Sequence, residues 1–386
     1  MNDTNPTVLL IDNQGLSHYT CYLATGLSRY KKIKLIGFSR EDYIFTDACS
    51  QTNIDFMSLE DLVFKNRSLW KMLIQKPISI FRRLINPVLF SNYKVIHLQG
   101  HLPLFFLYIL IIKLKRRKLV WTIHDVDLRP SSGGIRGKLE ILYMSLITQP
   151  KLLSTNADLL LVHGNNLKTN LIRKGVSASK IQIIPHFDYL YLQKYSKGDF
   201  LYEKERQYIL FFGNIKPYKG LDVFLKALDI VERDIGSGML RVLIAGKGDL
   251  KPYQSLLTKD KLNYIEIRNE DIPTEEIADI FQHSMSVILP YLDASQSGIV
   301  PLAYTFSKPV IVSNVGSLSE FVEHGSTGYV FENGNFQELA KLIVRTISDP
   351  VTTLRMGENA HEKLISQMSL EICSNTINKM YDEISS

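Results

Sequence analysis

Short runs of β-branched and apolar residues alternate with helical stretches along the whole of this 386-residue chain. Apolar runs of this kind are typical of strands in a parallel sheet that helices cover on both faces. We therefore expect an α/β fold, and not a sandwich or a helical bundle. In the first half the predicted strands are Val8–Ile11, Ile33–Phe38, Val95–Leu98, Leu119–Ile123, Leu159–Val162 and Ile181–Ile184.

A second series of strands follows a stretch from Phe187 to Gln207 that is rich in Tyr, Lys and Glu and has no clean period. Such a change of composition indicates a connection between domains. We expect two Rossmann-like, doubly wound domains, over residues 1–188 and 189–367. The second has predicted strands at Tyr208–Phe212, Arg241–Ala245, Tyr264–Ile267, Ser286–Leu289 and Val310–Val312, and predicted helices at Leu221–Glu232, Leu250–Leu257, Glu275–His283, Ile299–Phe306 and Phe336–Thr346.

Polar residues follow the predicted strands of the first domain. These are Asp12, Gln99, His124, His163 and His186. Ligands of open α/β sheets bind outside the carboxyl ends of the strands, so we expect chemistry at this edge. A single histidine at such a place more often has a structural hydrogen bond, and this is our interpretation of His18, His97, His101 and His163.

The loop after Phe212 concentrates glycine and lysine. It contains Gly213, Asn214, Lys216 and Lys219, and Gly220 then opens an amphipathic helix. Backbone N–H groups at a helix start, together with ammonium groups, form a site for a diphosphate. The alternative is that the two lysines only solvate a loop.

Three further segments share the glycine spacing of one known family. They are Arg241–Asp249, Leu289–Tyr304 and Lys308–Gly328. With the Gly-x-x-Lys-x-x-Lys-Gly loop at Gly213, they resemble, in the same order, the family-4 retaining glycosyltransferases of group 1. The resemblance implies the GT-B fold, in which two Rossmann-like domains face a cleft. It also implies that a last helix, within residues 368–386, returns to the N-terminal domain.

The first half resembles this family more weakly. The loop from Asp12 to His18, with Gly15, resembles the glycine loop that faces the donor, and His124 matches a strand-end histidine that contacts the transferred sugar. Pro185 and His186 resemble the strand end before the hinge.

The resemblance implies a hexosyltransferase that moves a sugar from a UDP- or GDP-linked donor to a hydroxyl, with retention of configuration. Lys216 and Lys219 would neutralise the leaving diphosphate together with backbone N–H groups near Gly298 and Ile299, and His124 would orient a reacting group. We expect no cofactor and no metal. The other expected donor contacts are Gly15, Gly213, Asn214, Gln296, Ser297, Arg268 near the nucleobase, and Glu320. The alternative for Glu320 is a helix-start residue that the helix dipole favours.

The sequence departs from the family at its usual pair of glutamates, whose places are taken by Ser295 and Ala303. Neither side chain can ionise, so Gln296, Ser297 or Asp293 would have to contact the sugar. One alternative is therefore a GT-B-like subunit that binds a nucleotide sugar without turnover. A nucleotide-sugar epimerase is another, although it needs acid/base carboxylates that we do not identify.

Metal and nucleotide-triphosphate chemistry have little support. Asp125 and Asp127 form an Asp-x-Asp that could hold Mg²⁺ or Mn²⁺, but they follow a strand of the first domain, and we interpret them as a loop. The three cysteines, Cys21, Cys49 and Cys373, are widely spaced, which argues against zinc and disulfides. No Walker-type loop is present.

The formal charge is +6, and basic residues gather at Lys113–Lys118 after the apolar run Leu102–Ile112. That run is too short for a bilayer. It is either a buried element with a solvated turn, or part of a face that rests on anionic lipid near a lipid-linked saccharide acceptor. The start lacks a secretory signal, so we expect a cytoplasmic protein, at the inner face of the plasma membrane in the second case. Mixed charges along the chain argue against a nucleic-acid partner.

Overall fold

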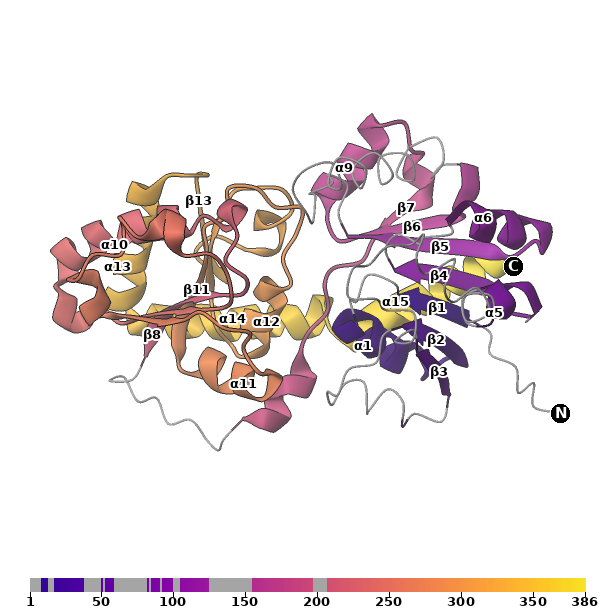
Figure 1. Cartoon of the computed structure of the whole chain (residues 1–386), viewed down its shortest axis with the longest axis horizontal. Helices are drawn as coiled ribbons and strands as arrows, with labels where there is room; N and C mark the ends of the chain where they lie inside the picture. The colour runs from indigo at the N-terminus through magenta and orange to yellow at the C-terminus, as the bar shows by residue number, and fades with distance from the viewer. Residues whose placement is uncertain are drawn as a thin grey trace. The chain divides into compact units, whose positions relative to one another are not determined.

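The computed structural model describes residues 8–12, 17–37, 50, 53–58, 82, 85–90, 92–99, 105–124, 155–196 and 207–386. The chain divides into two compact units (Figure 1). The N-terminal unit comprises Met1–Pro185 and Leu370–Ser386, and the C-terminal unit comprises His186–Ser369. Each unit has a parallel sheet with its own apolar core.

The N-terminal unit has a seven-stranded parallel sheet in the order β3-β2-β1-β4-β5-β6-β7. Residues Val8–Ile11 are fully buried because helices cover both faces. The strands are β1 (Val8–Asp12), β2 (Ile33–Gly37), β3 (Ile54–Ser58), β4 (Val95–Gln99), β5 (Lys118–Ile123), β6 (Leu159–Val162) and β7 (Ile181–Ile183). The described helices are α1 (Ser17–Leu27), α5 (Asn86–Phe90), α6 (Phe105–Leu114), α9 (Asn165–Arg173), the 3-10 turn η3 (Ala178–Lys180) and α15 (Leu370–Ser385).

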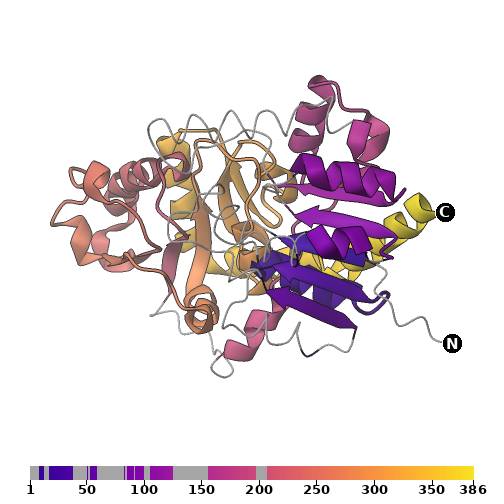
Figure 2. The ribbon, with the colours of Figure 1, turned by 45° about the vertical axis from the view of Figure 1, so that its right-hand side comes forward.

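The last helix, α15, packs against α1, as Figures 1 and 2 both show. Gly26 permits this approach, because a Cβ atom there would lie 2.9 Å from the Cβ atom of Ser374. An ion pair of 2.6 Å joins Lys31 to Asp382 at the end of the helix. The helix also brings the Tyr381 hydroxyl to the buried ring of His97.

The C-terminal unit has a six-stranded parallel sheet in the order β10-β9-β8-β11-β12-β13. Its strands are β8 (Tyr208–Phe212), β9 (Val242–Ala245), β10 (Ile265–Arg268), β11 (Ser284–Leu289), β12 (Val310–Ser313) and β13 (Gly328–Phe331). The helices are α10 (Leu221–Ile235), α11 (Thr274–Gln282), α12 (Ile299–Thr305), α13 (Phe336–Ser348) and α14 (Pro350–Gln367). The 3-10 turns are η4 (Leu190–Tyr195), η6 (Pro217–Lys219), η7 (Ser237–Met239), η8 (Lys251–Tyr253), η9 (Lys261–Asn263) and η10 (Ser319–Phe321).

Helix α10 shows how sequence pattern becomes packing in this unit. Its apolar residues recur at helical spacing, so Phe224, Leu228 and Val231 lie on one buried face against the sheet. Glycines bound it on both sides: Gly220 precedes it with φ +67° and Gly236 follows it with φ +81°. Both conformations favour glycine because a side chain would be strained there.

Each sheet reverses its strand order at one place, between β1 and β4 and between β8 and β11. At such a reversal the loops of the two neighbouring strands run in opposite directions and leave a crevice at the carboxyl edge. This crevice is the usual ligand position of a doubly wound sheet. The prediction of an α/β fold with parallel sheets is thus confirmed.

Some predicted elements differ from the structure. The helix predicted at Leu250–Leu257 is only the 3-10 turn η8 followed by turns. The prediction missed strands β3 and β13 and the long helix α14. No described helix has the length and apolar character needed to cross a membrane.

Candidate functional site

The loop after β8 lies at the strand-order reversal of the C-terminal unit. Gly213 has φ +95° and donates its N–H to the Ala245 carbonyl at 2.8 Å, and Ile215 donates to the Lys247 carbonyl at 2.8 Å. The N–H of Lys219 then closes η6 onto the Lys216 carbonyl at 2.9 Å. This backbone path turns the chain sharply between the end of β8 and the start of α10.

The loop after β11 touches the loop after β8. A Cβ atom on Gly220 would lie 1.9 Å from the Pro290 carbonyl oxygen, so glycine is required both by this contact and by the positive φ. The Leu292 N–H donates to the Tyr218 carbonyl at 2.7 Å. The two loops at the reversal are therefore fixed relative to each other.

The Lys219 side chain is 9% exposed, and its Nζ atom lies over the Tyr291 ring, 5.3 Å from the centroid. Its other neighbour is Gly213, where a Cβ atom would lie 2.9 Å from Nζ. Burial lowers the pKa of Lys219. In the part of the chain that the structure describes, no carboxylate lies within 4.0 Å of this ammonium group. A buried cation without a counter-charge is costly, so the site favours an anion.

Lys216 lies three positions before Lys219 on the same loop and is exposed. No carboxylate of the described chain pairs with it either. By contrast, Lys226 on α10 pairs with Asp222 at 3.3 Å, and Lys247 after β9 pairs with Asp271 at 2.6 Å. The positive charge of the loop between β8 and α10 is thus not compensated by a described carboxylate, whereas the charges of the nearby surface lysines are.

The segment before α12 supplies polar groups beside Lys219. The Ser297 hydroxyl accepts the Ile299 N–H at 3.2 Å and lies 3.4 Å from the hydroxyl of Tyr291, whose pKa burial raises to about 12. The expected role of the Ile299 N–H as a phosphate donor therefore competes with a hydrogen bond inside the loop. At Gly298, a Cβ atom would lie 2.7 Å from the Tyr189 hydroxyl.

Gln296 differs from its neighbours because its side-chain oxygen is buried and accepts no hydrogen bond from any described residue. A buried acceptor without a partner costs free energy, so a ligand hydroxyl or amide would be favoured there. Asn214, at the start of the β8 loop, is exposed.

The two positions where the family has glutamates are occupied as follows. The backbone of Ser295 accepts the Ser317 N–H at 3.2 Å, and Ser295 is half-buried. Ala303 is fully buried inside α12. The neighbouring turn is tight, because a Cβ atom on Gly316 would lie 1.6 Å from the Ala294 carbonyl oxygen. A packed methyl group therefore stands at residue 303, where no side chain can reach a ligand.

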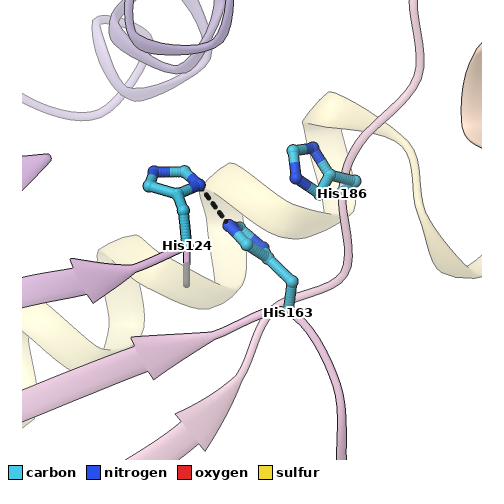
Figure 3. Close-up of side chains that lie close together, drawn as sticks. All are labelled: His124, His163 and His186. Carbon is cyan, nitrogen blue, oxygen red and sulfur yellow. Dashed lines mark hydrogen bonds between the residues drawn. The ribbon is translucent and has the colours of Figure 1, made fainter. Parts of the chain in front are cut away.

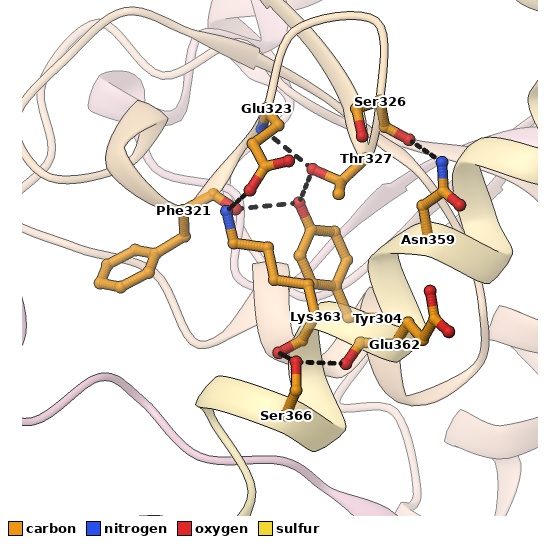
Figure 4. Close-up of polar contacts among 9 residues, drawn as sticks. All are labelled: Tyr304, Phe321, Glu323, Ser326, Thr327, Asn359, Glu362, Lys363 and Ser366. Carbon is orange, nitrogen blue, oxygen red and sulfur yellow. Dashed lines mark hydrogen bonds and ion pairs between the residues drawn. The ribbon is translucent and has the colours of Figure 1, made fainter.

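Glu320 lies exposed in η10 after β12, and the chain directly beyond it is held by a polar network (Figure 4). The Tyr304 hydroxyl donates to the Phe321 carbonyl at 3.2 Å and contacts the Thr327 hydroxyl at 2.9 Å. Glu323 pairs with Lys363 of α14 at 2.6 Å, which lowers the pKa of this carboxyl. The network fixes the backbone that carries Glu320.

Arg268 ends β10, at the edge of the sheet. Its guanidinium group binds Glu270 at 2.7 Å and Glu276 at 2.7 Å, and the hydrogen bonds to these carboxylates raise the pKa of Arg268. The charge is therefore compensated within the unit. A contact with a nucleobase would use the planar face of the group rather than its charge.

In the N-terminal unit, His124 follows β5 and shares hydrogen bonds with neighbouring strand ends. Its Nδ1 atom lies 3.0 Å from Nε2 of His163, and its Nε2 atom lies 3.0 Å from Oε1 of Gln99 (Figure 3 shows the histidine pair). His163 is fully buried, and burial lowers its pKa to about 4. Gly15, Asp125 and Asp127 lie outside the described residues.

The sequence places Gln99, His124 and His163 at the same carboxyl edge, but no bond of Gln99 or His163 to His124 was predicted. The signal was present, because all three follow or end neighbouring strands β4, β5 and β6. What was not readable is the direction of each side chain.

Two family models match the chain. The model "Glycosyltransferase Family 4" matches residues 14–187, and "Glycosyl transferases group 1" matches residues 195–363. Together they account for most of both units. Each match falls on the half in which the corresponding motifs were found.

Among similar curated proteins is an uncharacterized glycosyltransferase of Methanocaldococcus jannaschii, 24% identical over 267 residues, which cover 69% of this chain and 68% of that protein. The D-inositol 3-phosphate glycosyltransferase of Corynebacterium efficiens is 26% identical over 164 residues, 40% of this chain and 38% of the relative. This chain therefore matches well under half of that second relative's length.

Solved structures share the fold of the whole chain. The structure of HepE from Anabaena in complex with UDP-glucose has a TM-score of 0.71 and 18% identity, covering 98% of this chain and 100% of its own. At this identity the likeness concerns the fold, which is GT-B in both.

Proposed function

Since the chain is a glycosyltransferase of the group 1, family-4-like class with a GT-B fold, we propose that it transfers a sugar from a nucleotide diphosphate donor to a hydroxyl acceptor, with retention of anomeric configuration. The bond between the anomeric carbon and the phosphate oxygen breaks, and the nucleoside diphosphate leaves with the electron pair. The hydroxyl oxygen bonds to the anomeric carbon on the same face of the sugar, and the hydroxyl proton passes to the leaving diphosphate. We further propose that the sugar is a hexose and that no metal is needed.

The buried ammonium group of Lys219 is the observation that carries this proposal. It lies at the strand-order reversal, beside Gly213 and over Tyr291, with no carboxylate of the described residues to neutralise it. A fixed positive charge in a site of low dielectric stabilises the negative charge that develops on the leaving diphosphate. Exposed Lys216 adds a second cation on the same loop.

The neighbouring polar atoms suit the rest of a donor. Gln296 presents a buried oxygen that would accept a hydrogen bond from a sugar or ribose hydroxyl. This contact would compensate for the glutamates that Ser295 and Ala303 replace. In the N-terminal unit His124 would orient a reacting hydroxyl. The complex of the similarly folded HepE with UDP-glucose supports a UDP-sugar as the first donor to test.

For the acceptor we propose a saccharide carried on lipid, in the synthesis of a bacterial surface polysaccharide or glycolipid. The support is the end of α6, where Leu110 and Leu114 are 54% and 74% exposed and lie beside exposed Lys113, Lys115 and Arg116. Apolar side chains flanked by cations favour an anionic lipid surface. Sedimentation with anionic and with neutral vesicles tests this part: binding to both alike, or to neither, would contradict it.

The transfer itself is tested with a panel of UDP-, GDP- and ADP-sugars and hydroxyl acceptors, with nuclear magnetic resonance of the new glycosidic bond. The expected product keeps the anomeric configuration of the donor, and Lys219→Met abolishes it while Lys226→Met, on the adjoining helix, does not. Nucleotide binding without turnover across the panel would favour a non-catalytic subunit. Release of a free epimerised sugar would favour an epimerase.

A further inference from the structure

A continuous set of hydrogen bonds runs across the carboxyl ends of three neighbouring strands in the N-terminal unit. Gln99 of β4 contacts Nε2 of His124 at 3.0 Å, and Nδ1 of His124 contacts Nε2 of His163 at 3.0 Å. Nδ1 of His163 contacts the Ile184 carbonyl oxygen at 2.9 Å. Both ring nitrogens of His124 are therefore occupied by groups of the protein itself.

The Ile184 carbonyl sets the direction of these bonds. A carbonyl oxygen can only accept, so the proton of His163 must be on Nδ1. His163 is 0% exposed and its pKa is lowered to about 4, so its ring is neutral and its Nε2 atom carries no proton. An unprotonated Nε2 must accept, and the donor facing it is Nδ1 of His124. The neutral ring of His124 thus has its proton on Nδ1 and a lone pair on Nε2.

Gln99 can satisfy that lone pair because its amide offers either a donor or an acceptor. The two ends of an amide have nearly the same shape, and their orientation is assigned rather than observed. With its NH₂ group toward His124, Gln99 donates to Nε2, while its oxygen accepts from Nε2 of His97, 3.1 Å from the amide. The Tyr381 hydroxyl can then donate to Nδ1 of His97. In this arrangement the rings of His97, His124 and His163 are neutral, and the Nε2–H of His97 is shared between the Gln99 oxygen and the Thr122 hydroxyl, which lies 2.7 Å away.

The opposite amide orientation, with the Gln99 oxygen toward Nε2 of His124, requires a proton on that nitrogen as well. His124 would then be a cation. The Tyr19 ring packs at a steep angle against both imidazole rings, with centroid distances of 5.1 Å to His124 and 5.5 Å to His163. The orientation of Gln99 therefore follows the charge of His124.

We propose that the Ile184 carbonyl, acting through His163, holds His124 in the Nδ1–H tautomer, and that Gln99 occupies Nε2 until a substrate hydroxyl replaces it. Gln99 and His163 are thus positioning residues for the transfer, which rests on the proposed function. Only this tautomer lets His124 accept a hydrogen bond from a hydroxyl through Nε2. The other tautomer has a proton on Nε2, so it would donate to the substrate hydroxyl and could not accept the hydroxyl proton.

The test uses the full-length protein labelled with ¹⁵N-histidine, and long-range ¹H–¹⁵N spectra that distinguish protonated from unprotonated ring nitrogens. The His124→Asn protein assigns the resonances of His124. In the native protein at neutral pH we expect a protonated Nδ1 and an unprotonated Nε2. The glutamine of His163→Gln still offers an acceptor for the Nδ1–H group of His124, so this variant should keep the pattern. His163→Phe removes the acceptor, so the His124 ring should shift to the tautomer that is protonated on Nε2. A native His124 protonated on Nε2 alone would overturn the proposal.

Gln99→Met provides an independent variant that leaves His163 in place. It should change the Nε2 shift of His124 and leave Nδ1 protonated, and loss of the Nδ1 proton would contradict the proposed direction of the bonds. In transfer assays His163→Phe should lower kcat roughly tenfold or more, with His163→Gln close to native.

An unchanged kcat in a His163→Phe protein whose tautomer has changed would refute the positioning role. If the native protein transfers no sugar at all, the proposed function fails, and the nitrogen spectra still decide the tautomer.

Discussion

The ammonium group of Lys219 lies 5.3 Å from the centroid of the Tyr291 ring, and both side chains are buried. The ring face attracts a cation, by about 2 kcal/mol in a desolvated site. This is less than the cost of removing an ammonium group from water, so the contact compensates for burial only in part. A bound diphosphate would compensate for the rest of the free-energy cost of burying this charge.

Replacing Lys219 with methionine should stabilise the ligand-free protein. Burial lowers the pKa of Lys219, so the charged form is favoured in the unfolded chain, and an apolar side chain of similar length removes that penalty. We expect the free energy of unfolding to rise by about 1 kcal/mol. Chemical denaturation without ligand measures it. A marked loss of stability in Lys219→Met, with Lys226→Met unaffected, would show that the ammonium group is already satisfied in the empty site.

Gly213→Ala should weaken nucleotide binding through Lys219. The new Cβ atom would lie 2.9 Å from Nζ, and φ at this position is +95°, so the side chain must shift and the backbone is strained. We expect a loss of stability of about 1–2 kcal/mol together with weaker binding of a nucleoside diphosphate. Gly334→Ala is the control, because its φ is +77° and no heavy atom lies within 4 Å. Equal binding by the two variants would exclude the contact with Nζ as the cause.

Tyr304→Phe should destabilise the C-terminal unit. The substitution removes the hydroxyl that bonds the Phe321 carbonyl and contacts the buried Thr327 hydroxyl. The expected cost is about 1–3 kcal/mol in urea denaturation. Lys363→Met, which breaks the partly exposed pair with Glu323, should cost less than about 1 kcal/mol. The reverse order would mean that the ion pair, and not the tyrosine, holds the segment after Glu320.

Acid should destabilise the N-terminal unit through its buried histidines. Burial lowers the pKa of His163 to about 4 and that of His97 to about 3, below the ordinary value of 6.5. The unfolded chain therefore binds protons first, and stability that is fully present above pH 6.5 is lost as the pH falls toward 4. Each histidine contributes a slope of up to about 1.4 kcal/mol per pH unit.

His163→Gln isolates this effect, since glutamine does not titrate. Between pH 6.5 and 5 we expect the free energy of unfolding to fall less steeply with pH in the variant than in the native protein. The two slopes should differ by up to the contribution of one bound proton. Urea denaturation at several pH values measures the difference. Parallel curves for the two proteins would show that His163 takes up protons equally well when folded and unfolded.

The glycine–lysine loop could be found from sequence because its residues are adjacent in the chain and open a helix. The electrostatics of the loop could not be predicted, because Lys219 is buried against Tyr291, which comes from another loop. The same applies to Gln99 and His163, which meet His124 only when their strands pair. Side-chain direction across a sheet edge is a tertiary property.

Some secondary structure was readable and was missed. Helix α14 begins with Asp349 and Pro350, a capping residue followed by proline at the first helical position, and the Asp349 side chain accepts the Thr352 N–H. The interior of α14 is only weakly amphipathic, so its apolar residues show no clear helical period. Strand β13 is short and begins at Gly328, whose φ of +159° brings the backbone close to Val310. Such a short strand can be recognised only from its pairing with the neighbouring strand.

The claim that Lys219 binds the donor diphosphate is tested most directly by titration calorimetry of the native, Lys219→Met and Lys226→Met proteins. Each is titrated with the nucleoside, its monophosphate and its diphosphate, for uridine and for guanosine. We expect the native protein and Lys226→Met to prefer one diphosphate over its nucleoside by roughly a hundredfold, and Lys219→Met to lose this preference. An undiminished preference for the diphosphate in Lys219→Met would show that Lys219 does not bind the diphosphate.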